Sequence, residues 1–127
     1  MNVKQFSEQA GLSPHTIRYY DKLGLFPTIR RTNAGYRDFS NRDLNWIVFI
    51  KKLKTTGMAM VDIQRYVDLV KAGDHTQNER RAMLVAHQQH VQKQMEEWKE
   101  SATAIDSKIE FYEQEMLRQP EPLLQEA

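Results

Sequence analysis

The 127-residue sequence contains no cysteine, and it has only five glycines and four prolines. Without cysteine the chain can form no disulfide, no thiolate metal site and no cysteine-based redox sensor. It also has no apolar run of about 18 residues that could span a membrane. Its first residues, MNVKQFSEQAGLS, lack the apolar stretch of a signal peptide. We therefore expect a cytoplasmic protein that does not act at a membrane.

The usual sequence signatures of an enzyme are missing as well. There is no glycine-rich phosphate loop, no carboxylate pair placed for acid–base catalysis, and no nucleophile beside a placed histidine. His87 and His90 are three residues apart and could share a helix face, but two histidines are too few ligands for a tight metal site. We expect no enzymatic activity, no metal and no cofactor.

Charge is distributed unevenly along the chain. Residues 1–56 contain ten Lys and Arg against four Asp and Glu, whereas residues 57–127 contain eight against thirteen. The charges of the two halves, +6 and −5, nearly cancel and leave a net charge of +1. A basic first half indicates a polyanionic partner, although charge also fluctuates along ordinary chains.

Helix start and stop signals follow one another closely over the first 72 residues. A short helix ends at Gly11, and Ser13 with Pro14 begins a second one that Gly24 ends. Two short helices joined by a glycine-containing turn predict a helix-turn-helix. Two further helices are predicted over about residues 40–55 and 61–72. The predicted capping boxes are Asn2 with Gln5, Ser40 with Asp43, and Thr76 with Glu79.

The segment between Phe26 and Phe39 has a different pattern. It contains a Thr-Asn-Ala-Gly turn over residues 32–35, with the β-prone Ile29 and Tyr36 on its two sides. This arrangement predicts a β-hairpin.

The last predicted helix starts near Thr76 and runs about 40 residues, until Pro120. Apolar residues recur along it in alternating steps of four and three. These ten positions, the seam, are Leu84, Gln88, Val91, Met95, Trp98, Ala102, Ile105, Ile109, Tyr112 and Met116. Nine of the ten are apolar, which is typical of a coiled coil. A lone helix cannot bury such a stripe, so we expect the nine apolar residues to form a homodimer.

Spacing divides the second helix into an inner and an outer side. Ile17, Tyr20 and Leu23 are expected to face inward. The outer side, the recognition face, consists of His15, Arg18, Tyr19 and Lys22. The hairpin adds Arg30, Arg31, Asn33 and Arg37 close to its tip. Such donors suit phosphate oxygens and base edges, so we expect these residues, together with Thr16, to bind duplex DNA.

At this point the sequence resembles the MerR-type transcription regulators. The matching blocks are GLSPHTIRYYDKLGLFP (11–27), NAGYRDFSNRDLNWI (33–47) and LKTTGMAMVDI (53–63). The resemblance implies that Arg18 and Tyr19 contact DNA, and that Tyr36 and Arg37 belong to a wing that grips its backbone. It also implies that the long helix pairs antiparallel with that of a second copy. The family usually has Ser or Thr where this chain has Ala59, so the fourth helix is expected to start less firmly.

We therefore predict a mainly α-helical protein with a small β-hairpin wing. A winged helix-turn-helix over residues 1–72 precedes an antiparallel coiled-coil dimerisation helix over 76–118 and a flexible tail over 119–127. The predicted function is transcription control: the homodimer binds a near-palindromic promoter operator and distorts it. By resemblance, RNA polymerase at the promoter is an indirect partner. The alternative is a coiled-coil adapter whose helix-turn-helix binds protein.

An unidentified small-molecule effector is a further expected partner. Because the chain has no cysteine, such an effector must bind without a thiol reaction. Trp46 and Tyr66, with the start of the long helix, are the candidate lining of its site, and Tyr112 is a further candidate. Aromatic residues at helical spacing are more often simple core residues, which is the competing interpretation.

Overall fold

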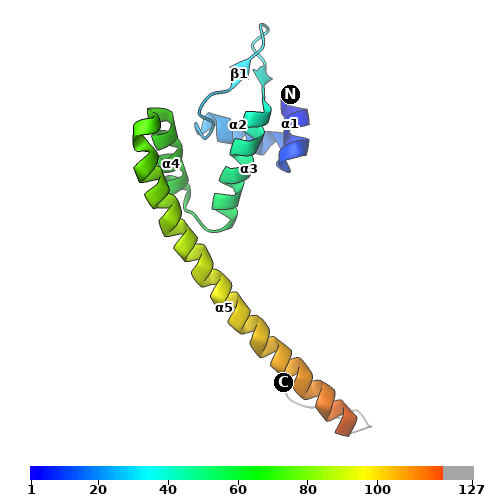
Figure 1. Cartoon of the computed structure of the whole chain (residues 1–127). Coiled ribbons are helices and arrows are strands. Elements are labelled where there is room, and N and C mark those ends of the chain that lie inside the picture. The colour runs from blue at the N-terminus through cyan, green and yellow to red at the C-terminus, as the bar shows by residue number, and fades with distance from the viewer. Residues whose placement is uncertain (119–127) are drawn as a thin grey trace. The chain divides into compact units, whose positions relative to one another are not determined.

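The computed structural model describes residues 1–118, and the predicted tail over 119–127 lies outside them, as does Pro120. In chain order the elements are α1 (Val3–Ala10), α2 (Pro14–Lys22), β1 (Arg30–Arg31), β2 (Arg37–Asp38), α3 (Asn41–Thr55), α4 (Met60–Ala72), the 3-10 turn η1 (Asp74–Thr76) and α5 (Gln77–Arg118) (Figure 1). The predicted mainly helical class with one hairpin is confirmed. Among the described residues, no helix combines the length and apolar character needed to cross a membrane.

The chain divides into two compact units, and the boundary lies within α5. The first unit is Met1–His87, and the rest of α5 belongs to the second. The first unit therefore includes the predicted domain over 1–72 and also the first turns of α5. Met83 and Leu84 from these turns pack against the core of the first unit.

Side-chain caps define the starts of the helices largely as the sequence predicts. The Asn2 Oδ1 accepts a hydrogen bond from the Gln5 amide (2.8 Å), and the Gln5 Oε1 accepts one from the Asn2 amide (3.0 Å). Ser40 and Asp43 form the same reciprocal box at the start of α3. At the start of α4, Ala59 has the extended backbone of a cap residue but no side-chain oxygen to accept a bond.

The third predicted capping box is wrong. Thr76 is already part of the 3-10 turn, and it is buried rather than placed at an exposed helix start. Its hydroxyl donates to the carbonyl oxygens of Leu69 (2.6 Å) and Gly73 (2.8 Å). Thr76 therefore closes the turn between α4 and α5 instead of capping the first amides of α5.

Three buried phenylalanines fix both ends of the hairpin to the helices. Phe6 comes from α1, Phe26 from the segment after α2, and Phe39 from the residue after β2. The rings of Phe6 and Phe39 are stacked with centroids 4.2 Å apart, and Phe26 lies about 6 Å from each. Because these side chains bury large apolar areas, they hold the base of the hairpin against the helix-turn-helix.

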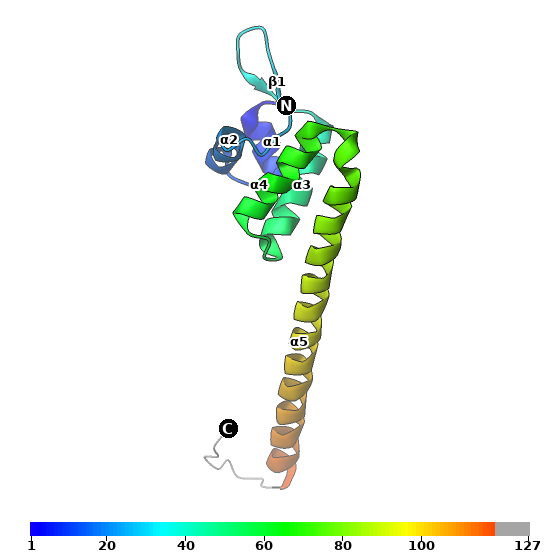
Figure 2. The ribbon, with the colours of Figure 1, turned by 90° about the vertical axis from the view of Figure 1, so that its left-hand side faces the viewer.

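The hairpin projects beyond the helices of the first unit (Figure 2). Its two strands are antiparallel, with Arg30 opposite Asp38 and Arg31 opposite Arg37. The Thr32 amide donates to the Tyr36 carbonyl (2.7 Å), which closes the turn. The predicted hairpin and its turn are thus confirmed.

Apolar residues of α3 and α4 complete the core. Ile47, Ile50 and Leu53 from α3 are buried against Ile63 and Val67 from α4. The two predicted helical stripes therefore form one core, on which the helix-turn-helix rests.

Candidate nucleic-acid interface

The structure divides α2 into the inner and outer sides that its sequence predicts. Ile17 and Tyr20 are buried, and Leu23 is half-buried against the core. The recognition face is exposed along its whole length: His15, Arg18, Tyr19 and Lys22. Tyr19 is 49% exposed, a large fraction for an aromatic side chain that could have packed inward.

A lysine of α3 and a lysine of α4 bind the C-terminal ends of the two helices of the helix-turn-helix. The Nζ of Lys51 donates to the carbonyl of Gly11 (3.2 Å), and that of Lys71 donates to the carbonyl of Gly24 (2.7 Å). Both glycines have positive φ just after the last turns of α1 and α2. The carbonyls at a helix C-terminus carry partial negative charge, so a lysine ammonium stabilises these ends.

A concave surface of about 590 Å³ lies between α2 and the hairpin. Its lining consists of His15, Arg18, Tyr19, Asp21, Lys22, Arg31 and Arg37. The whole recognition face thus joins two arginines of the hairpin in one basic surface, the α2–wing surface. Four cationic side chains line it against a single carboxylate. Such a surface attracts a polyanion.

That single carboxylate has a structural partner. The Arg37 Nε donates to the Asp21 Oδ2 at 2.6 Å, which links β2 directly to α2. The two side chains are only 27% and 22% exposed. Sequence reasoning assigned Arg37 to the DNA backbone and did not consider Asp21. The one sequence signal for this pair is an acidic residue near the end of a basic helix, and it does not identify a partner.

The remaining predicted contact residues lie outside the α2–wing surface. The Thr16 hydroxyl is 2.9 Å from the Ser13 Oγ and takes part in the start of α2. Arg30, Asn33 and Tyr36 are exposed on the hairpin, and Tyr36 is 73% exposed.

The seam predicted in α5 is largely exposed in the single chain. Met95, Trp98, Ile105, Ile109 and Met116 are each at least 50% exposed. Ala102 is also exposed, and Val91 and Tyr112 are half-buried. Leu84 differs from these residues because it packs against the core of its own first unit. The exposed apolar stripe is the feature expected of a helix that pairs with another helix.

The predicted effector residues are only partly brought together. Trp46 and Tyr66 line a second cavity, and their rings are stacked with centroids 6.0 Å apart. The described residues that line this cavity all lie between residues 27 and 71, so the start of α5 is not among them. Tyr112 belongs to the second unit. Including the start of α5 in the lining was therefore wrong, because residues of α3, α4 and the segment after α2 line the cavity without it. The candidacy of Tyr112 stays a prediction.

Of the two histidines considered for a metal, His87 contacts a threonine at the end of α3. The His87 Nε2 is 2.7 Å from the Thr56 Oγ1, which joins α5 to the end of α3. Within residues 1–118, no group of three His, Asp or Glu side chains is placed to hold a metal ion.

A helix-turn-helix with a basic outer face, a β-hairpin wing and an exposed coiled-coil seam defines the class of winged-helix DNA-binding proteins. Two family models match the chain: "MerR HTH family regulatory protein" over residues 1–69, and "MerR, DNA binding" over residues 44–108. An HTH-type transcriptional regulator of Haemophilus influenzae is 36% identical over 107 residues, which are 84% of this chain and 79% of that protein.

Solved structures agree with the sequence comparisons. A protein of Listeria monocytogenes described as a MerR family regulator has a TM-score of 0.86 and 31% identity, over 93% of this chain and 89% of that one. The structure of HiNmlR, a MerR family regulator lacking the sensor domain, was solved bound to promoter DNA. It matches this chain with a TM-score of 0.81 and 34% identity, over 89% of this chain and 86% of that one. This protein belongs to the MerR family of DNA-binding transcriptional regulators. Because these relatives are regulators, the expectation of a non-enzymatic protein is confirmed.

Proposed function

We propose that this protein binds a near-palindromic operator within a promoter as a homodimer and distorts that DNA to control transcription. The observation that carries the proposal is the α2–wing surface, where the recognition face and two hairpin arginines meet. An α-helix fits the major groove of B-DNA, and a basic ribbon beside it follows the backbone. The relative HiNmlR, bound to promoter DNA, supports a promoter as the target.

The residues have different roles in this proposal. Arg18 and Tyr19, exposed at the middle of α2, contact base edges. His15 and Lys22 at the two ends of the recognition face contact phosphates, and Thr16 lies beside them. The hairpin residues Arg30, Arg31, Asn33, Tyr36 and Arg37 contact the backbone.

Dimerisation through the exposed part of the α5 seam supplies the second half of the binding surface. Two copies related by a twofold axis present two α2 helices, and a near-palindromic operator mirrors that symmetry. RNA polymerase bound at the same promoter is the indirect partner. A regulator of this kind acts where the chromosome is, so we place the protein in the cytoplasm.

The proposal is tested by comparing an operator, selected from random duplexes with the purified protein, against a random duplex. Arg18→Ala and Tyr19→Ala should each weaken operator binding by about 1–3 kcal/mol and leave binding to the random duplex nearly unchanged. Arg65→Ala, an exposed arginine of α4 outside the α2–wing surface, is the matched control. Fluorescence anisotropy at several salt concentrations gives both affinities and their salt slopes.

The outcomes separate this proposal from a protein-binding adapter. DNA binding through phosphates should weaken steeply as salt rises. If the wild-type protein selects no duplex, or if its affinity does not depend on salt, the proposed function is wrong. If Arg18→Ala lost the same affinity for both duplexes, Arg18 would contact the DNA backbone rather than the bases.

A further inference from the structure

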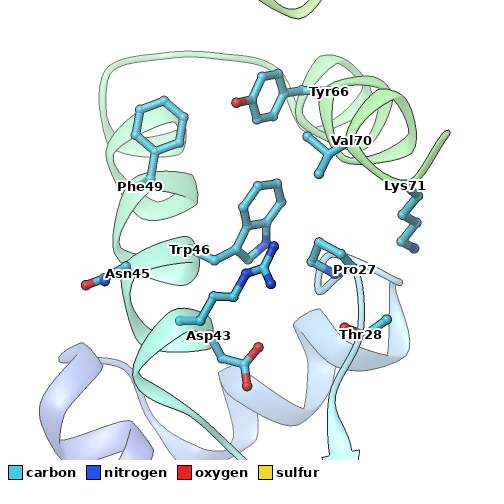
Figure 3. Close-up of a pocket in the computed structure, with 10 residues that line it drawn as sticks. Pro27, Thr28, Asp43, Asn45, Trp46, Phe49, Tyr66, Val70 and Lys71 are labelled. Atoms are coloured by element: carbon cyan, nitrogen blue, oxygen red, sulfur yellow. The ribbon is translucent and has the colours of Figure 1, made fainter. Parts of the chain in front are cut away.

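The cavity around Trp46 is lined half by aromatic and aliphatic residues and half by polar or charged ones. It has a volume of about 730 Å³, within the range of about 300–1,000 Å³ typical of small-molecule sites. Figure 3 shows Trp46 in the middle of the site, with Tyr66, Phe49, Val70 and Pro27 around it. Tyr66 is stacked on Trp46 at an interplanar angle of 14°, and Phe49 is tilted against Tyr66 at 55°.

The Trp46 ring is held in place, and part of the aromatic wall is open to solvent. The indole Nε1 of Trp46 donates to the Leu25 carbonyl at 2.7 Å, which fixes the plane of the ring. Tyr66 is buried, whereas Phe49 is 37% exposed. A fixed indole face suits a flat apolar ligand, because Trp46 loses little side-chain entropy when the ligand binds.

The polar lining carries more positive than negative charge. Arg42 and Lys71 contribute two cations, and Asp43 contributes one carboxylate. The Asp43 Oδ2 already accepts hydrogen bonds from the Ser40 amide (2.9 Å) and the Ser40 hydroxyl (3.0 Å). Arg42 is exposed at the second residue of α3, and its planar guanidinium matches the geometry of a carboxylate.

We propose that this cavity binds a small aromatic carboxylate, whose ring packs on Trp46 and Phe49 and whose carboxylate pairs with Arg42 and Lys71. Charge decides between ligand classes here. An aromatic cation would gain from the rings but would face two cationic side chains. A neutral aromatic compound would gain the packing alone, so it should bind more weakly than the acid.

The cavity is placed to influence DNA binding, and this step rests on the proposed function. Pro27 and Thr28 lie on the segment between α2 and β1, and Arg42 lies a few residues after β2. The ligand would therefore contact the chain on both sides of the hairpin. Lys71 also donates to the Gly24 carbonyl after α2, so an anion beside Lys71 would act on the end of the recognition helix. A ligand shifts this arrangement only if it binds one position of the hairpin better than another.

The test is calorimetric titration of the full-length protein, without DNA, with three compounds of the same ring size. These probes are 1-naphthoate, the neutral 1-naphthalenemethanol and the cationic 1-naphthylmethyltrimethylammonium. The naphthoate should bind best. Arg42→Gln should weaken naphthoate binding about five- to tenfold and leave the alcohol unchanged, because it removes only a partly exposed charge pair. Arg65→Gln, an exposed arginine of α4 outside the lining, is the matched control and should bind all three compounds like the wild type.

Several results would overturn the site. No heat of binding with any probe, preference for the ammonium compound, or an equal loss in Arg42→Gln and Arg65→Gln would each do so. Because these titrations contain no DNA, they remain informative even if the proposed operator binding fails. The regulatory step has its own readout, which is operator affinity with and without saturating naphthoate. An unchanged affinity would refute that step while the binding site stands.

Discussion

At the scale of single residues, the Arg37–Asp21 ion pair joins the hairpin directly to the recognition helix. Its atoms are 2.6 Å apart, and both side chains are only partly exposed. The pair also neutralises Asp21, the one carboxylate of the α2–wing surface, so that it would repel a phosphate less. In the proposed function Arg37 has two roles, because a guanidinium has more donors than the one Nε that binds Asp21.

A double-mutant cycle with Arg37→Ala and Asp21→Ala tests the link. We expect a coupling of about 0.5–1 kcal/mol in the free energy of unfolding, because the pair is partly exposed and its charges are screened. Chemical denaturation of the four proteins at one concentration measures it. Arg37→Ala should also weaken operator and random duplex alike, with a shallower salt slope. Additive effects on unfolding would mean that the two residues do not interact in solution.

The recognition face could be predicted from sequence, and the ion pair could not. The side of α2 that bears His15, Arg18, Tyr19 and Lys22 follows from helical geometry alone once Ile17 and Tyr20 are assigned to the core. The partner of Asp21 lies 16 residues away, on a different element. Such a contact depends on how the hairpin packs, which Phe6 and Phe39 determine, and local patterns carry no information on it.

At the scale of elements, helix starts are determined by a few side chains. The boxes at Asn2 and Ser40 could be predicted, because a short polar residue and an acceptor three positions later satisfy each other's amides. Thr76 with Glu79 has the same pattern, but the 3-10 turn gives Thr76 other carbonyls to bind. The 3-10 turn after Gly73 directs the Thr76 hydroxyl away from the first amides of α5, and the residue spacing alone does not reveal that turn.

The start of α4 offers a direct test of cap energetics. Ala59 has the φ and ψ of a cap residue (−64° and 146°) without a side-chain acceptor. Ala59→Ser should therefore raise the free energy of unfolding by about 0.5–1 kcal/mol, since the hydroxyl can accept a bond from an amide of the first turn. Denaturant melts at fixed protein concentration measure the change. Ala104→Ser, exposed within α5, is the control and should be neutral or slightly destabilising. An unchanged Ala59→Ser would mean that the start of α4 is already satisfied by solvent.

At the scale of the whole molecule, the seam is the surface of α5 that the proposed dimer would bury. Several large apolar side chains of α5 are exposed in the single chain, among them Trp98, Ile105 and Ile109. Their heptad spacing could be read from sequence, because it depends only on helical periodicity. The packing of Leu84 onto its own domain could not, because it depends on where the first unit ends.

Changing Ile105 and Ile109 together to Asp should give monomers in sedimentation experiments. The double variant would place carboxylates in an apolar interface, where they cannot be solvated. Operator binding should be lost with the dimer. Thr103→Asp with Ser107→Asp adds the same charge on the opposite side of α5 by helical spacing, and it should remain dimeric. A dimeric Ile105→Asp/Ile109→Asp variant would show that the seam is not the interface.

In the proposed function, two copies of this chain bind one operator through their α2 helices and wings. Hydroxyl-radical footprinting of the purified protein on its selected operator measures this arrangement. We expect two protected segments related by dyad symmetry, with their centres separated by about one helical turn of DNA, roughly 34–36 Å, or a multiple of it. Arg18→Ala should weaken both segments equally. A single protected segment, or protection without dyad symmetry, would show that the chain does not bind DNA in this way.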